Sequence, residues 1–143
     1  NMLNADASLF FDGTCASDDC IWKFYYPMEM FTNGASNPYA AAYLAGWTSA
    51  EIPTAEKAWG GSNMPRHNSP AYDALSEESK LLALDDPRYT EVIIEMNDIV
   101  SNAAVIPLIH RASASAWGSD ILGTGDLNAW DSEYWNIEDW YRG

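Results

Sequence analysis

The residues best suited to binding chemistry lie in one loop, GWTSAEIPTAEKAWGGSN, which places two tryptophans among glycines, a proline and small polar residues. The glycine before the first tryptophan permits a tight turn, and hydroxyls and a carboxylate follow the ring. Loops often carry binding sites, and aromatic faces cover apolar or sugar-like groups. We therefore predict a ligand-binding set of Trp47, Thr48, Ser49, Glu51 and Trp59. For Trp47, a core position at the end of a strand is an equally good explanation.

The same region gives little support for catalysis. Glu51 and Glu56 could form the carboxylate pair of a glycosidase, but a chain with 21 acidic residues offers many such pairs. The sequence has no phosphate-binding glycine loop and no G-x-S-x-G nucleophile motif. Its two histidines, His67 and His110, stand in unrelated contexts. We therefore expect no enzymatic activity, no cofactor and no metal site.

The two cysteines, Cys15 and Cys20, are separated by four polar or small residues in GTCASDDCIW. This spacing allows a small disulfide loop, whereas a zinc site would need two further ligands. We predict the disulfide, with two free buried thiols as the alternative. A disulfide indicates an oxidising compartment.

Length and charge narrow the possible partners. The 143 residues, of which 48% are hydrophobic, suffice for one domain with a core. The net charge of -14 argues against nucleic acid and anionic membrane surfaces as partners. No apolar run approaches the ~18 residues of a membrane span. The N-terminal residues do not resemble a signal peptide, although one could have been removed or belong to a longer precursor.

Two helix starts are the clearest local signals. Ser69 precedes Pro70, and Asp86 precedes Pro87, which matches the preference for a capping residue before a proline in the first helical turn. After the second start, apolar residues recur every three or four positions, as on one face of a helix. We expect a third helix, capped by Asp18 and Asp19, over residues 21–31, with Pro27 kinking or ending it.

Strands are expected between these helices. Residues 6–13 (DASLFFDG) and 104–111 (AVIPLIHR) have the composition of strands, and residues 39–47 (YAAAYLAGW) could form a short helix or turn leading into a strand that ends near Trp47. Trp130, Trp135 and Trp140 are expected to pin the C-terminal tail to the body. Mixed helices and strands predict an α/β fold.

The order of these motifs resembles a known family. GWT, WGGSN, RHNSPAYDAL, an acidic-proline helix start, AVIPLIHR and WNIEDWYR follow one another as in the C-terminal part of the extracellular solute-binding proteins of the peptide/nickel type. These are the family 5 receptors of ABC importers. SLFFDG and KFYYPMEMFTNG also resemble the strand and helix that precede the GWT loop, so the resemblance covers nearly the whole chain.

The resemblance implies the C-terminal portion of a two-lobed, periplasmic-binding-protein-like fold of type II. Residues 1–143 would be a single segment, forming most of one lobe to about residue 110 and then a tail returning toward the other lobe. Such a piece is expected to leave an unpaired strand edge, with SLFFDG the first candidate, or an exposed apolar patch. Its partners would be the remainder of the receptor chain, a small ligand and an ABC permease. The location would be periplasmic or extracellular, with a possible membrane tether in a missing N-terminal part but no direct membrane insertion.

Ligand identity stays open at this stage. Peptide-binding members carry an aspartate three residues after the tryptophan, which holds the peptide's α-ammonium group, and Ala50 stands at that position here. Either Glu51 takes this role, or the ligand has no ammonium group at that end. Peptides, oligosaccharides and opine-like solutes all remain candidates. The alternative from another class is a secreted glycan-binding or glycan-hydrolysing protein.

Overall fold

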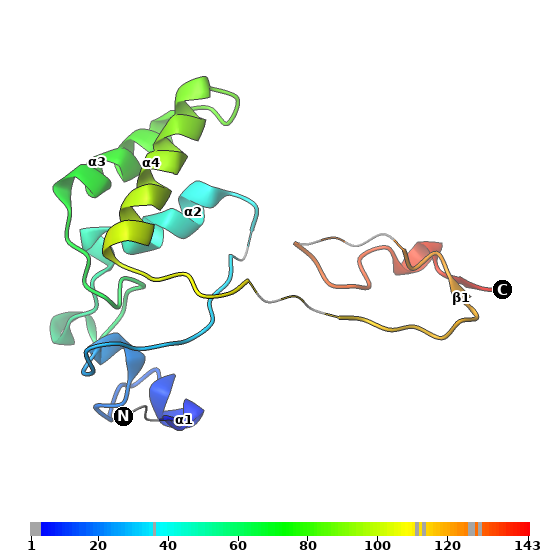
Figure 1. Ribbon diagram of the computed structural model, residues 1–143, viewed down its shortest axis with the longest axis horizontal. Helices are drawn as coiled ribbons and strands as arrows, with labels where there is room; N and C mark the ends of the chain where they lie inside the picture. The colour runs from blue at the N-terminus through cyan, green and yellow to red at the C-terminus, as the bar shows by residue number, and fades with distance from the viewer. Residues whose placement is uncertain (1–3, 36, 111, 113, 126–127, 129) are drawn as a thin grey trace. The chain divides into compact units, whose positions relative to one another are not determined.

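The computed structural model describes residues 4–35, 37–110, 112, 114–125, 128 and 130–143. The chain divides into two compact units (Figure 1). Unit 1 contains the described residues up to Ala35 together with Tyr39–Pro107, and unit 2 contains the described residues of 36–38 and 108–143. Each unit is considered by itself below.

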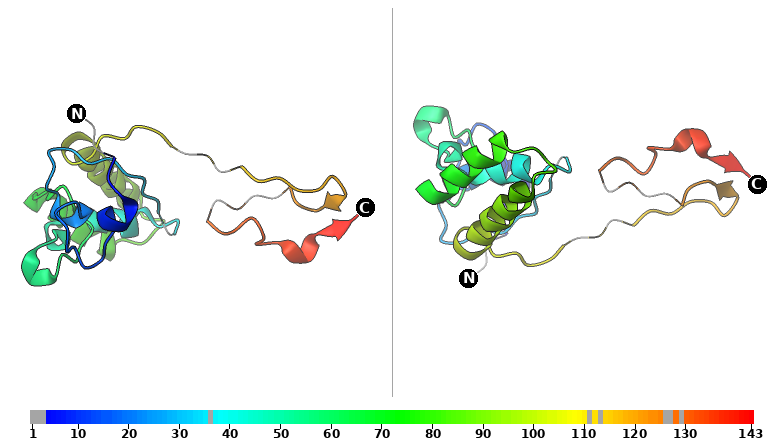
Figure 2. Two further views of the ribbon diagram at one scale, coloured as in Figure 1. Left: turned by 90° about the horizontal axis from the view of Figure 1, so that it is seen from below. Right: turned by 90° about the horizontal axis from the view of Figure 1, so that it is seen from above.

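Two helices form the frame of unit 1. α3 (Pro70–Leu81) and α4 (Pro87–Ala103) lie side by side in all views of Figures 1 and 2. The Ser69 hydroxyl accepts from the Tyr72 N–H, and the Asp86 carboxylate accepts from the Arg88 N–H. Both predicted helix starts are therefore confirmed, since each side chain caps an otherwise unpaired backbone donor. No helix among the described residues is long and apolar enough to cross a membrane.

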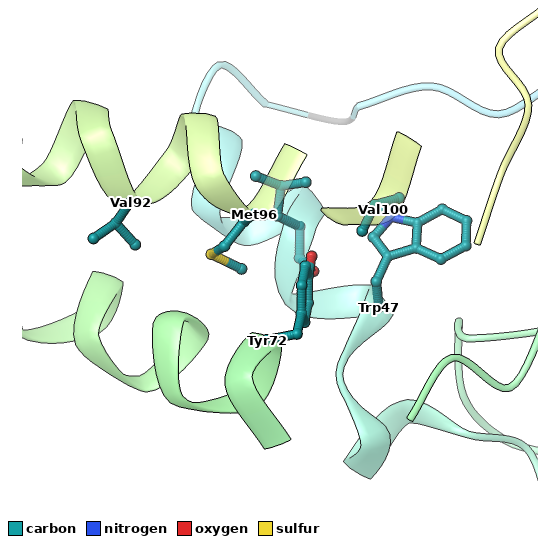
Figure 3. Close-up of a cluster of buried hydrophobic side chains, with 6 residues drawn as sticks. Trp47, Tyr72, Val92, Met96 and Val100 are labelled. Atoms are coloured by element: carbon teal, nitrogen blue, oxygen red, sulfur yellow. The ribbon is translucent and has the colours of Figure 1, made fainter. Parts of the chain in front are cut away.

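The core of unit 1 forms where these helices meet the short helix α2 (Ala40–Leu44) and the 3₁₀ helix η2 (Ala45–Trp47). Figure 3 shows side chains from α3, α4 and η2 converging on this cluster. Its buried members are Leu44, Trp47, Tyr72, Val92, Met96 and Val100. The Tyr72 hydroxyl donates to the Leu44 carbonyl at 2.7 Å, which joins α3 to α2 and satisfies a buried polar group. Burial raises the pKa of this phenol, so it remains a neutral donor.

The predicted strands of unit 1 are wrong over their described residues. Residues 7–10 form a helical turn, α1 (Ala7–Phe10), because the Asp6 carboxylate accepts from the Ser8 N–H at 2.8 Å and caps it. The alanine-rich stretch before Trp47 continues from α2 into η2 without a strand. Residues 104–110 form no strand either, and Ile106, Leu108 and Ile109 are exposed. A strand needs a neighbour to pair its backbone groups, and sequence periodicity cannot supply one.

The helix predicted over residues 21–31 is reduced to one 3₁₀ turn, η1 (Ile21–Lys23). Phe24 adopts a left-handed conformation with φ of 48°, which ends the turn. The Trp22 and Lys23 carbonyls accept hydrogen bonds from the Arg66 guanidinium at 3.1 and 2.7 Å. A distant side chain therefore satisfies these carbonyls, and Pro27 has no N–H that could bond the Lys23 carbonyl in a longer helix.

Unit 2 contains the only sheet among the described residues. β1 (Ile121–Leu122) and β2 (Tyr141–Arg142) pair antiparallel, with Ile121 opposite Arg142. The 3₁₀ helix η5 (Ile137–Asp139) precedes β2. Within this unit the Trp140 ring contacts the rings of Trp117 and Tyr134, and its Nε1–H donates to the buried amide of Asn136 at 3.0 Å.

Candidate ligand-binding loop

Trp47 lies in the core of unit 1. Only 6% of its surface is exposed, and its ring lies near Val100 at one end of the cluster in Figure 3. This position favours the second of the two roles considered from the sequence, a core residue. The difference from the sequence-based site arises because η2 turns the ring toward α4, and a loop motif alone does not fix that direction.

The hydroxyls of Thr48 and Ser49 are already used within the protein. Thr48 Oγ1 donates to the Ala45 carbonyl at 2.9 Å. The Ser49 backbone N–H donates to Asp73 Oδ1 at 2.9 Å, and the Ser49 hydroxyl donates to Asp73 Oδ2. Asp73 lies in the first turn of α3, so this double contact fixes the loop to the start of that helix.

The buried side chain of Asn63 organises the loop. Its Nδ2 lies within hydrogen-bonding distance of the carbonyl oxygens of Trp47, Thr48 and His67, at 3.1, 2.9 and 2.7 Å. Its Oδ1 accepts from the His67 N–H at 2.9 Å, and its own backbone N–H donates to the Glu51 carbonyl at 3.0 Å. Asn63 is fully buried. One amide thus satisfies backbone groups on both sides of the loop, which would otherwise be costly to bury.

Glu51, Glu56 and Lys57 are charged groups on the outer side of this loop. The Glu51 side chain is half-exposed, in the 3₁₀ helix η3 (Ser49–Glu51). Lys57, in η4 (Ala55–Lys57), donates its ammonium to the carbonyls of Ala50 and Ile52 at 2.6 and 3.3 Å. The position after Ser49 therefore presents a methyl group and a nearby lysine, while the adjacent carboxylate of Glu51 stays accessible.

Trp59 connects this loop to the cysteine segment. It is half-buried and left-handed, with φ of 62°, and its ring centre lies 5.8 Å from Lys23 Nζ, within the range of a cation–π contact. Lys23 also pairs with Asp18 at 3.1 Å. Cys15 and Cys20, which precede Lys23 in the sequence, form a disulfide with their Cα atoms 5.2 Å apart.

Hydrogen bonds from Asn63 and to Asp73 hold the backbone of this loop. Sequence reasoning missed Asn63 and Asp73, which hold it in place. It also missed Arg66, which donates to the carbonyls of Trp22 and Lys23. The signal that could have found them is a run of polar residues in the segment that leads into α3 and in its first turn, where side chains commonly bond backbone groups.

No cluster of three or more His, Cys, Asp or Glu side chains suited to a metal occurs among the described residues. Of the five predicted ligand residues, Trp47 is buried, and the hydroxyls of Thr48 and Ser49 already form hydrogen bonds within the protein. Glu51 and Trp59 are partly exposed.

Comparison with known proteins gives no relative. No family model matches the chain, and neither a curated protein nor a solved structure is significantly similar to it.

Proposed function

We propose that this chain belongs to the substrate-binding component of an ABC-type importer. It would help to capture a small peptide or another small solute in a cleft between two lobes and deliver it to a membrane permease. The observation that carries the proposal is the ordered series of motifs from GWT to WNIEDWYR, spread over nearly the whole sequence. In this proposal the α/β lobe is completed by the remainder of the receptor, and the protein works outside the cytoplasm.

The geometry of the loop supports a binding role. Asn63 and Asp73 hold the backbone of residues 47–51 through hydrogen bonds from two directions. A preformed loop binds without first losing much conformational entropy, which is how receptors gain affinity. Glu51 and Trp59 are the side chains through which a ligand would contact this loop, with Glu51 suited to an ammonium or hydroxyl group.

A thermal-shift screen tests the proposal. Di- to pentapeptides, oligosaccharides and opine-type amino acid conjugates would be added to the purified protein. A binding solute at 100 times its Kd raises the free energy of unfolding by about 2.7 kcal/mol. Glu51→Gln and Trp59→Ala should weaken the response, whereas Glu77→Gln on the exposed face of α3 should not. Hydrolysis of a chromogenic glycoside that disappears in Glu51→Gln would instead favour a glycan-active protein.

A further inference from the structure

A buried carboxylate without a partner stands out in unit 1. Both carboxylate oxygens of Glu29 are enclosed by the protein, and neither has a hydrogen-bond partner. No ion pair involving Glu29 occurs among the described residues, although Arg66 is close enough to influence it. An enclosed, unpaired carboxylate is costly in its charged form and much less so when it is protonated.

The hydrogen bonds of Arg66 explain why it forms no ion pair with Glu29. The guanidinium of Arg66 donates to the carbonyls of Trp22, Lys23 and Met64, at 3.1, 2.7 and 2.9 Å. Its backbone is left-handed, with φ of 58°. Through its hydrogen bonds, Arg66 is committed to backbone acceptors and leaves Glu29 without a direct partner.

The other groups near the Glu29 carboxyl do not cancel the effect of burial on its pKa. Burial raises the pKa of Glu29. The nearby backbone N–H of Tyr26, which does not form a well-aligned hydrogen bond with either oxygen, and the charge of Arg66 lower it by less. Arg66 is the one charged side chain, among those described, that acts on this carboxyl group. On the segment that carries Glu29, the Tyr26 hydroxyl donates to Asp19 and so points to a different acid.

We propose that Glu29 is a proton-binding site whose charge state decides whether the segment of residues 25–30 keeps its carboxylate enclosed. With Glu29 protonated, the segment stays closed over a neutral group. Loss of the proton leaves an unpaired anion inside, and the segment opens so that water can reach the carboxylate. Tyr25, Met28 and Met30 on this segment are exposed, so few apolar contacts oppose the opening.

The sign of the pH effect follows from linkage. The folded chain binds the Glu29 proton more readily than the unfolded chain, so this group contributes stability at low pH. That contribution is lost as the pH rises from about 4.3, the usual value for glutamate, through the raised pKa of the folded state. Glu29→Gln cannot lose a proton and should lack this loss.

Urea unfolding of the 143-residue chain between pH 4 and pH 8 tests this. At pH 7, Glu29→Gln should have a midpoint roughly 0.3–0.5 M higher than wild type, and the two should converge near pH 4. Glu138→Gln removes the same charge from an exposed carboxyl group and controls for the net charge of -14. Parallel curves for wild type and Glu29→Gln would overturn the proposal.

Two measurements read the site directly. NMR titration of the wild-type chain with ¹³C-labelled glutamate should show the Glu29 carboxyl titrating above its ordinary range, and titration at or below about 4.3 would overturn the proposal. Hydrogen exchange of residues 25–30, corrected for intrinsic rates, should lose protection as the pH rises above the ordinary titration range of glutamate in wild type but not in Glu29→Gln. Equal pH dependence in both proteins would also overturn it. Neither measurement depends on the transport ligand.

Discussion

Replacing Trp47 with alanine tests whether the GWT tryptophan serves the fold or the ligand. The indole is 94% buried, against Val100 and the other members of the core cluster. A side chain that buries about 200 Å² at roughly 25 cal/mol per Å² contributes ~5 kcal/mol at most. Because the unfolded chain is partly compact and alanine retains some buried area, we expect Trp47→Ala to lower the free energy of unfolding by about 3–4 kcal/mol.

The assay is urea unfolding followed by far-ultraviolet circular dichroism, because tryptophan fluorescence would itself change with the substitution. Trp59→Ala is the matched control: its ring is half-buried beside Lys23, and we expect a loss of about 1 kcal/mol. A loss below about 1 kcal/mol for Trp47→Ala would refute the core assignment. If that small loss accompanied weaker binding of a solute found in the thermal-shift screen, Trp47 would return to the ligand site.

Two further predictions concern the loop, and a third concerns the disulfide. Asn63→Ala should cost about 2–3 kcal/mol in urea unfolding, since it leaves buried carbonyls without donors; an unchanged midpoint would contradict the hydrogen-bond network. Gly61→Ala should cost about 1–3 kcal/mol in the same assay, because Gly61 has φ of 134° and a Cβ there would overlap the Glu51 carbonyl, whereas Gly34→Ala meets no atom and serves as control. Thiol titration of unfolded, unreduced protein should find no free cysteine, and two free thiols would rule out the disulfide.

The sequence by itself determined the two long helices of unit 1, α3 and α4. Ser69-Pro70 and Asp86-Pro87 predict the starts of α3 and α4, because capping and the fixed φ of proline act within a few residues. The apolar periodicity of the second helix likewise predicted its buried face, which carries Val92 and Met96. These signals are local, so they can be read without knowing what the rest of the chain does.

Only the tertiary structure decided which strand-like segments do not form strands and in which direction the side chains of the loop point. The patterns of residues 6–13 and 104–111 were strand-like, but a strand exists only when a second segment pairs with it. Trp47 was ambiguous until η2 fixed its direction toward α4, and the isolation of Glu29 depended on Arg66 bonding the carbonyls of Trp22 and Lys23. These outcomes depend on contacts between residues far apart in the chain, which composition and spacing do not encode.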